Sequence, residues 1–345
     1  MVSLMLNIRA LHVSWGKMQG VFLHRRVFTQ MKKETVTTNQ ITEGVIWKQL
    51  LLFFFPIVLG TFFQQLYNTA DTIVVGRFVS KEALAAVGGS AAQIVGLIVG
   101  FFVGLASGAS VIISQFYGAK NRVQLNRALH TAYAFSIIGS IFITVLGILI
   151  APWMLELMHT PQETMADALL YLRIYFAGII FVFIYNVGSS ILRAMGDSRR
   201  PLYYLIVCCF LNIVLDIVLV IVFHMGVAGV AIGTIISQLI SCVLVLTCLY
   251  RSEGSYQLRF SKLKINGAYM EQIFQVGVPA GIQSTVINLS NALLQSSVNS
   301  FGSIAMAGYT AANNILGFLY MSVNSITQAC MSFTSQNYGV GKYKR

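Results

Sequence analysis

An isolated acid marks one of the most apolar parts of the chain. Asp216 is the only acidic residue between positions 201 and 250, and that stretch contains no Lys or Arg. A carboxylate at membrane depth costs about 2.5–3.5 kcal/mol on insertion scales, so an intramembrane acid is by default a functional-site hypothesis. Asn212 lies one helical turn earlier, on the same face of a helix. This pair is suited to binding a cation or carrying a proton.

Counting residues places Thr234 at the depth of Asp216. The turn signal between them is centred on Met225, nine residues after Asp216 and nine before Thr234. At about 1.5 Å per residue, both lie roughly 13–14 Å from the turn, near the middle of a bilayer core about 30 Å thick. Two antiparallel helices then bring a carboxylate, an amide and a hydroxyl together. The alternative is that Asp216 is a structural carboxylate that holds the next helix through Thr234.

A second acid is predicted at a similar depth. Gln64, Asn68 and Asp71 fall at i, i+4 and i+7 on one helical face, and Asp71 lies nine residues before a turn expected near Ser80. The helices that carry the two acids run in the same direction, so both acids lie in the same half of the bilayer. We therefore expect Asp71 to join the cation site. The alternative is a helix-end acid paired with Arg77.

A third polar face carries amides without charge. Asn288, Asn291, Gln295 and Asn299 are spaced at i, i+3, i+7 and i+11. Unpaired amides facing lipid would each cost several kcal/mol, so these side chains must face protein or water. They either form hydrogen bonds between helices or line a water-filled cavity.

Prolines and glycines indicate where the helices bend and pack. Pro56 and Pro279 lie inside apolar helices, where each removes a backbone hydrogen bond, and they are either hinges or tolerated kinks. Glycines also recur every four residues, a pattern that predicts close helix packing. They are Gly96, Gly100, Gly104 and Gly108.

The composition indicates a polytopic membrane protein. The 345 residues are 56% hydrophobic and only 10% charged, with a mean hydropathy of +0.73, whereas soluble domains have roughly 25% charged residues. Stretches poor in charge predict eight spans. They lie between positions 48 and 77, 82 and 120, 127 and 156, and 168 and 192, with two more within 201–250 and two between 271 and 342.

The net charge of +12 follows the predicted topology and does not indicate nucleic-acid binding. Basic residues gather in every second loop and in the tail after position 341. The positive-inside rule then places those loops and both chain ends in the cytoplasm. The sequence contains no nucleotide-binding loop and no His-Glu-x-x-His motif. We therefore expect no enzymatic activity and no cofactor, and any transport must use an ion gradient.

Internal spacing predicts two parallel repeats. Pro56 and Pro279 are 223 residues apart, and the segments 115–118 (Gln-Phe-Tyr-Gly) and 336–339 (Gln-Asn-Tyr-Gly) are 221 apart. Six spans separate the copies, so the two copies have the same orientation. The predicted organisation is a basic extension at 1–40, disordered or preceding the true start, a six-span lobe at 41–250, a cytoplasmic linker at 251–270 and a partial second lobe at 271–345.

These motifs resemble the multidrug and toxic compound extrusion (MATE) family. The resemblance covers about residues 41–345. Its most specific part is the spacing of Asn212, Asp216 and Thr234. It also includes Pro56, Asp71 before Thr-Ile-Val-Val-Gly-Arg, and the segments 115–119 (Gln-Phe-Tyr-Gly-Ala) and 193–197 (Arg-Ala-Met-Gly-Asp).

The resemblance implies an all-α membrane fold with a six-helix N-terminal lobe and the first two helices of a second lobe. It also implies a Na⁺- or H⁺-coupled antiporter that exports cationic drugs or toxic organic compounds from a bacterial cell, without an obligate protein partner. The implied cation site is Asp71, Asn212, Asp216 and Thr234. Gln64, Asn68, Asn288, Asn291 and Gln295 are expected to line the cavity, with Pro56 and Pro279 as hinges.

Three alternatives stay open. The family has twelve helices and this sequence provides eight, so the chain could be a truncated product that does not transport. A lipid-linked oligosaccharide flippase of the same superfamily would need a cationic cavity, for which the sequence offers only Arg173, a residue better placed to extend to the membrane interface. A major-facilitator transporter is disfavoured because the loop after Gly118 lacks the expected acid.

Overall fold

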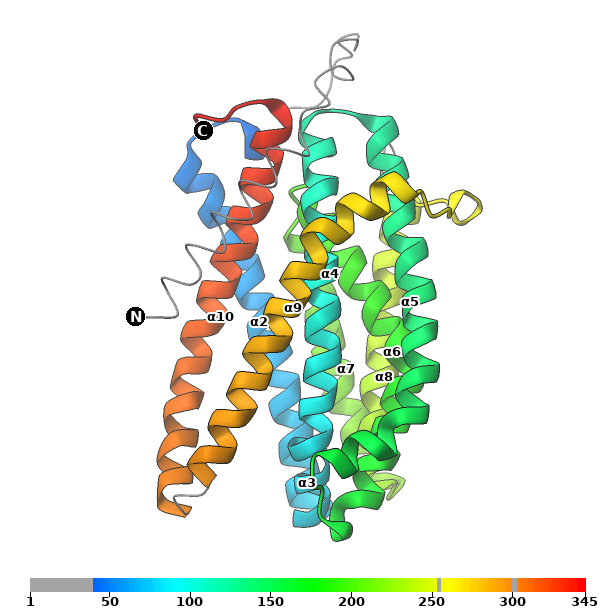
Figure 1. Ribbon diagram of the computed structural model, residues 1–345, viewed down its shortest axis with the longest axis vertical. Coiled ribbons are helices and arrows are strands. Elements are labelled where there is room, and N and C mark those ends of the chain that lie inside the picture. The colour runs from blue at the N-terminus through cyan, green and yellow to red at the C-terminus, as the bar shows by residue number, and fades with distance from the viewer. Residues whose placement is uncertain (1–39, 253–255, 300–302) are drawn as a thin grey trace. The chain divides into compact units, whose positions relative to one another are not determined.

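The computed structural model describes residues 40–252, 256–299 and 303–345. Apart from Gln40, the predicted N-terminal extension lies outside the described residues, as does most of the turn predicted at residues 301–303. Within the described ranges the regular secondary structure is entirely helical (Figure 1). This confirms the expected all-α class.

Within the described ranges, eight long helical units form at the positions of the eight predicted spans. They are α2 (Ile46–Phe78), the series α3 (Lys81–Ala86), η2 (Val87–Ala91) and α4 (Ala92–Gly118), then α5 (Arg122–Leu157), α6 (Gln162–Ala194), α7 (Arg199–Asp216) continued by η3 (Ile217–Val222), α8 (Gly226–Arg251), α9 (Gly267–Asn299) and α10 (Ser303–Val340). Short 3₁₀ turns, η1 (Gln40–Thr42) and η4 (Phe260–Lys262), precede α2 and α9.

Six of these units are long and apolar enough to cross a membrane, judged by length and composition within the described residues. They run from α2 to α8. The remaining helices, α9 and α10, contain 33 and 38 residues, so length alone would allow each to span. Their crossing of the bilayer stays a prediction.

Local sequence sets several helix ends. The Ser80 hydroxyl accepts a hydrogen bond from the Ala83 N–H and begins α3, and the Asn121 side chain accepts from the Gln124 N–H and begins α5. Such side-chain caps satisfy N–H groups that have no partner inside the helix. The predicted turn around Met225 is confirmed, because η3 ends at Val222 and α8 begins at Gly226.

Two of the four predicted glycines of α4, Gly104 and Gly108, make a close contact with the backbone of another helix, whereas a Cβ at Gly96 would meet nothing within 4 Å. A Cβ added to Gly104 would collide with backbone atoms of Gly281 and Ala280, and one added to Gly108 would lie 2.5 Å from the carbonyl oxygen of Ile273. The partner helix α9 contributes its own glycines at this crossing. The two backbones therefore approach as closely as small residues allow.

The two copies of the sequence repeat meet at the ends of α4 and α10. A Cβ added to Gly118 would collide with the carbonyl of Gln336, and a Cβ added to Gly339 would collide with the carbonyl of Gln115. We call this reciprocal contact the glycine crossing. Gln336 also donates from Nε2 to the carbonyl oxygen of Ala194 at the end of α6, at 2.6 Å. The crossing therefore joins both predicted lobes.

One face of α5 has the character expected of a lipid-facing surface. Ile138, Phe142, Val145 and Leu149 are all more than half exposed, with Leu149 at 71%. These residues are spaced three or four apart, so they form one stripe. Exposed apolar stripes of this kind are unusual on a soluble protein and ordinary against hydrocarbon.

Candidate cation site and central cavity

Three helices bring the predicted site residues together. Asp71 comes from α2, Asn212 and Asp216 from α7, and Thr234 from α8, and all four are buried. The Thr234 hydroxyl donates to Oδ2 of Asp71 at 3.4 Å. The Asp71 carboxyl is also close enough to interact with the side chains of Asp216 and Asn212. The structure therefore brings together the four residues that the sequence analysis assigned to one site.

The backbone around Asp216 is unusual. Asp216 is the last residue of α7, and the chain continues directly into the π-helical segment η3. π-helical turns inside helices are rare and occur frequently at functional sites, because they redirect side chains relative to the α-helical pattern. On the facing helix, a Cβ added to Gly233 would lie 2.5 Å from Oδ1 of Asp216. Glycine at this position lets the carboxylate sit against the α8 backbone.

Several polar atoms of the site have no hydrogen-bond partner among the residues that the structure describes. These buried atoms are Oδ1 of Asp71, Oδ1 and Nδ2 of Asn212, and both carboxyl oxygens of Asp216. Buried polar groups are nearly always satisfied, and two adjacent buried carboxyls cannot both be ionised without a compensating cation. A shared proton or a hard cation bound by these oxygens would satisfy them.

Replacing Gly233 with Ala should disturb the site without changing any of its polar groups. The new Cβ would push the Asp216 carboxyl away from α8, and we expect the affinity for the coupling cation to fall by about tenfold or more, a size typical of lost site geometry. The measurement is the stabilisation of the purified chain against thermal unfolding as Na⁺ is added or the pH is lowered. Gly317→Ala, where a Cβ meets nothing within 4 Å, is the control and should respond like the parent.

A cavity of about 660 Å³ opens beside this site. Pro56, Gln64, Asn68, Asp71, Thr234 and Asn288 are among the residues that line it. Asn291 is exposed and is not among the lining residues, and the side chains of Gln295 and Asn299 lie outside the part of the chain that the structure describes. Pro279 lies within α9 away from the lining. One face of α2, from Pro56 to Asp71, therefore forms part of the cavity wall.

The cavity also contains residues that the sequence analysis did not single out. Four buried tyrosines line it, namely Tyr67, Tyr171, Tyr175 and Tyr185. Tyr67 lies one turn before Asp71, a spacing that could have identified it. Aromatic side chains are typical of sites for small organic ligands.

Arg173 is exposed and is not among the lining residues, which agrees with the interfacial position favoured by the sequence. The expectation that Arg173 is the sole candidate for a cationic cavity is wrong, because Arg193 lines the cavity and donates to the Ser190 hydroxyl at 3.2 Å. Arg193 is one residue from the end of α6. Rotation of that helix turns its side chain inward, which residue counting does not reveal.

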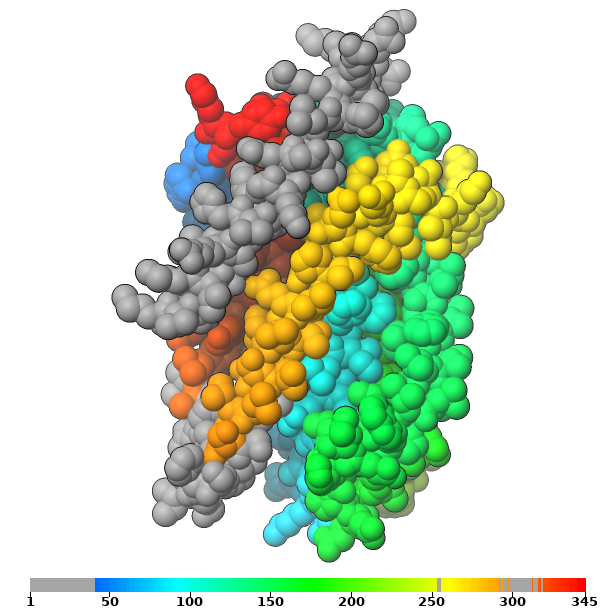
Figure 2. All heavy atoms as spheres, viewed as in Figure 1, coloured from blue at the N-terminus to red at the C-terminus, as the bar shows by residue number. Residues whose placement is uncertain are grey.

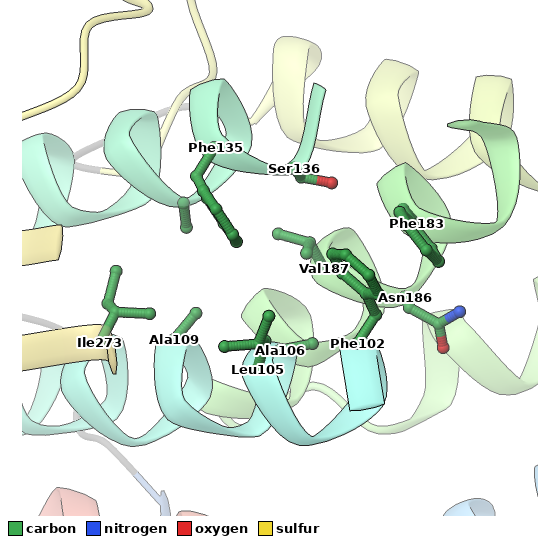
Figure 3. A pocket seen from close by; sticks show the side chains of 11 residues that line it. Phe102, Leu105, Ala106, Ala109, Phe135, Ser136, Phe183, Asn186, Val187 and Ile273 are labelled. Atoms are coloured by element: carbon green, nitrogen blue, oxygen red, sulfur yellow. The ribbon is translucent and has the colours of Figure 1, made fainter. Parts of the chain in front are cut away.

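A second cavity is too small to be a ligand site. It has a volume of about 20 Å³ and lies among apolar side chains of α4, α5, α6 and α9. Phe102 and Phe183 stack beside it with ring centroids 4.0 Å apart, and Figure 3 shows that Ser136 and Asn186 are its few polar neighbours. It is a packing void of about one water molecule.

Comparisons with known proteins identify the family. The MatE family model matches residues 56–218 and 279–345. The probable multidrug resistance protein YoeA of Bacillus subtilis is 30% identical over 325 residues, which cover 92% of this chain and 70% of YoeA. The chain belongs to the MATE family. The probable multidrug resistance protein YpnP of the same organism is 32% identical, over 88% of this MATE chain and 68% of YpnP.

Solved structures share the fold of this MATE chain. An outward-facing multidrug resistance MATE family transporter is 25% identical with a TM-score of 0.81, over 90% of this chain and 70% of that one. A MOP superfamily transporter from Pyrococcus furiosus is 24% identical with a TM-score of 0.82. Members of the family are multi-pass membrane transporters, so this chain is not an enzyme. It spans about 70% of the length of these relatives.

Proposed function

We propose that this MATE chain carries the ion-coupling half of a Na⁺- or H⁺-driven antiporter that exports cationic drugs or toxic organic compounds. The proposed location is the bacterial plasma membrane with the N-terminus in the cytoplasm. The observation that carries the proposal is the buried pair Asp71 and Asp216, grouped with Asn212 and Thr234 and rich in unsatisfied oxygens. A carboxylate pair of this kind exchanges a cation at membrane depth.

The proposed coupling runs through α2. Asp71 and Pro56 lie on the same helix and line the same cavity, about four turns apart. Near Pro56, Phe53 and Ile57 pack against Ala329 and Phe333 of α10. Binding of a cation at Asp71 and Asp216 changes the charge beside α2 and, through a bend at Pro56, shifts α10. This links the ion site to the glycine crossing.

The proposed substrate is a small organic cation, which would bind among the cavity's tyrosines. Aromatic faces attract organic cations, and YoeA and YpnP are named as probable multidrug resistance proteins. A flippase for lipid-linked oligosaccharides is less well supported, because Arg193 is the only basic side chain that lines the cavity in the described part of the chain. A pyrophosphate substrate would require several cations.

The test is transport in proteoliposomes. Residues 1–345 would be joined to the part of YoeA that this chain does not cover, and uphill movement of a cationic dye would be measured under an imposed Na⁺ or pH gradient. We expect at least one gradient to drive the dye. Dye movement that depends on neither gradient would exclude cation coupling. The same assay on the 345-residue chain alone would show whether its eight helices are sufficient for transport.

A further inference from the structure

A third pocket, separate from the other two, is formed where α5 begins and the linker before α9 passes over it. It has a volume of about 730 Å³ and is lined by Arg122, Val123, Asn126, Arg127, His130, Thr131, Lys262, Lys264 and Asn266. We propose that this pocket binds the phosphate headgroup of an anionic phospholipid, and that the lipid holds the linker against α5. The inference is independent of the proposed transport function.

The pocket has an unbalanced positive charge. Four of its nine lining residues are cationic and none is acidic. All four, Arg122, Arg127, Lys262 and Lys264, are exposed, and none forms an ion pair with any residue that the structure describes. Like charges gathered in one concave site repel one another, and a phosphate group relieves that repulsion while accepting hydrogen bonds. The pocket therefore matches a compact anion.

The two segments that carry the cationic side chains are joined by hydrogen bonds of buried residues. His130 and Thr131 of α5 are buried, at 2% and 0% exposure. Nε2 of His130 accepts from the Arg259 N–H at 3.1 Å, while its Nδ1 lies 2.7 Å from the carbonyl oxygen of Asn126. These bonds require the neutral ring with its proton on Nδ1.

A second bond fixes the other end of the linker, where the Asn266 N–H donates to the Thr131 hydroxyl at 3.3 Å. The backbone that carries Lys262 and Lys264 is thus attached to α5 on both sides. The positive-inside rule requires only that basic residues lie on one side of the membrane. The rule does not explain why buried polar side chains hold basic residues of two separate segments in one pocket.

The surroundings favour a lipid over a free phosphate. Figure 2 shows the linker (yellow) and the beginning of α5 (green) together on one face, and the hydrogen bonds between them agree. Further along α5, the stripe from Ile138 to Leu149 is apolar and exposed, as expected of a surface that faces hydrocarbon. Tyr250 near the end of α8 and Phe260 on the linker are exposed and stack with ring centroids 6.3 Å apart. Aromatic residues are enriched at membrane interfaces. Basic pockets at this level bind lipid headgroups.

The test uses the purified 345-residue chain in a neutral detergent. Native mass spectrometry would measure binding of phosphatidylglycerol and of phosphatidylcholine. A juxtamembrane Lys or Arg contributes roughly fivefold to binding of an anionic lipid, so we expect a preference for phosphatidylglycerol of about tenfold or more. The variant Arg122→Gln, Arg127→Gln, Lys262→Gln and Lys264→Gln should reduce that preference to within about twofold.

A matched control removes the same number of charges elsewhere. Lys48, Arg199, Arg251 and Lys344 are exposed, lie on the same predicted face and do not line the pocket. Replacing these four by Gln should preserve the preference. Two double variants, Arg122→Gln with Arg127→Gln in α5 and Lys262→Gln with Lys264→Gln in the linker, should each lose part of the preference for phosphatidylglycerol. They keep the proposal testable if the quadruple variant does not fold.

Three outcomes would overturn the proposal. The first is an unchanged preference in the folded quadruple or double variants. The second is an equal loss in the matched control, which would indicate non-specific attraction to net charge. The third is binding of free glycerol phosphate as tight as that of phosphatidylglycerol, which would assign the pocket to a soluble anion.

Discussion

Asp216→Asn is expected to abolish ion-coupled efflux in the chimera with YoeA while leaving the protein in the membrane. The amide has nearly the shape of the carboxyl, so the packing against Gly233 is kept, but the side chain can no longer release a proton or offer a negative charge to a cation. Coupling free energies reach about 3 kcal/mol, which corresponds to about 150-fold, so we expect the gradient-dependent rate to fall to the background of the assay. Asp71→Asn should weaken coupling through the same site.

The control for these variants is an acid outside the site. Glu163 is exposed in the first turn of α6, and Glu163→Gln should export the dye at the parental rate. The amount of each variant in the membrane is measured by immunoblot, so that loss of protein is separated from loss of coupling. Export by Asp216→Asn at the parental rate, with parental Na⁺ and pH dependence, would make Asp216 a structural residue and refute the ion-site interpretation.

Gly118→Ala is expected to open the glycine crossing. Its Cβ would collide with the carbonyl of Gln336, which is backbone and cannot move by changing a rotamer. Overpacking of this kind costs about 1–3 kcal/mol, so we expect a clear fall in the thermal unfolding midpoint of the purified chain. In the chimera we expect efflux to fall as well, because α4 and α10 can no longer close against each other.

Gly96→Ala is the matched control in the same helix. A Cβ at Gly96 meets nothing within 4 Å, and Ala is the better helix former by about 0.8–1 kcal/mol, so this variant should be as stable as the parent or more so. Gly339→Ala meets the carbonyl of Gln115 in the reciprocal contact and should repeat the effect of Gly118→Ala. A Gly118→Ala chain as stable as Gly96→Ala would show that the crossing is not a close contact.

The sequence alone was sufficient to predict which residues of the candidate site lie at one level relative to the helix turns. Helical rise is fixed at about 1.5 Å per residue, and the turns at Ser80 and Met225 provide a reference level. Asp71, Asp216 and Thr234 were placed at one depth for that reason, and they meet in the structure. The spacing of the glycines in α4 likewise predicted close packing, because residues four apart lie on one face.

Only the tertiary structure decided how each helix is rotated and which helices are neighbours. Counting along the chain gives the level of a residue in its helix, but it gives neither the rotation of the helix nor its neighbours. It could not show that Arg193 lines the cavity and Arg173 does not. It also could not show that Gly233 contacts Asp216. The basic pocket could not be predicted from the sequence either, because the sequence does not show which segments are neighbours. Its charges come from segments more than a hundred residues apart, and they meet because His130 and Thr131 bind the linker backbone, a contact between distant segments that no local pattern encodes.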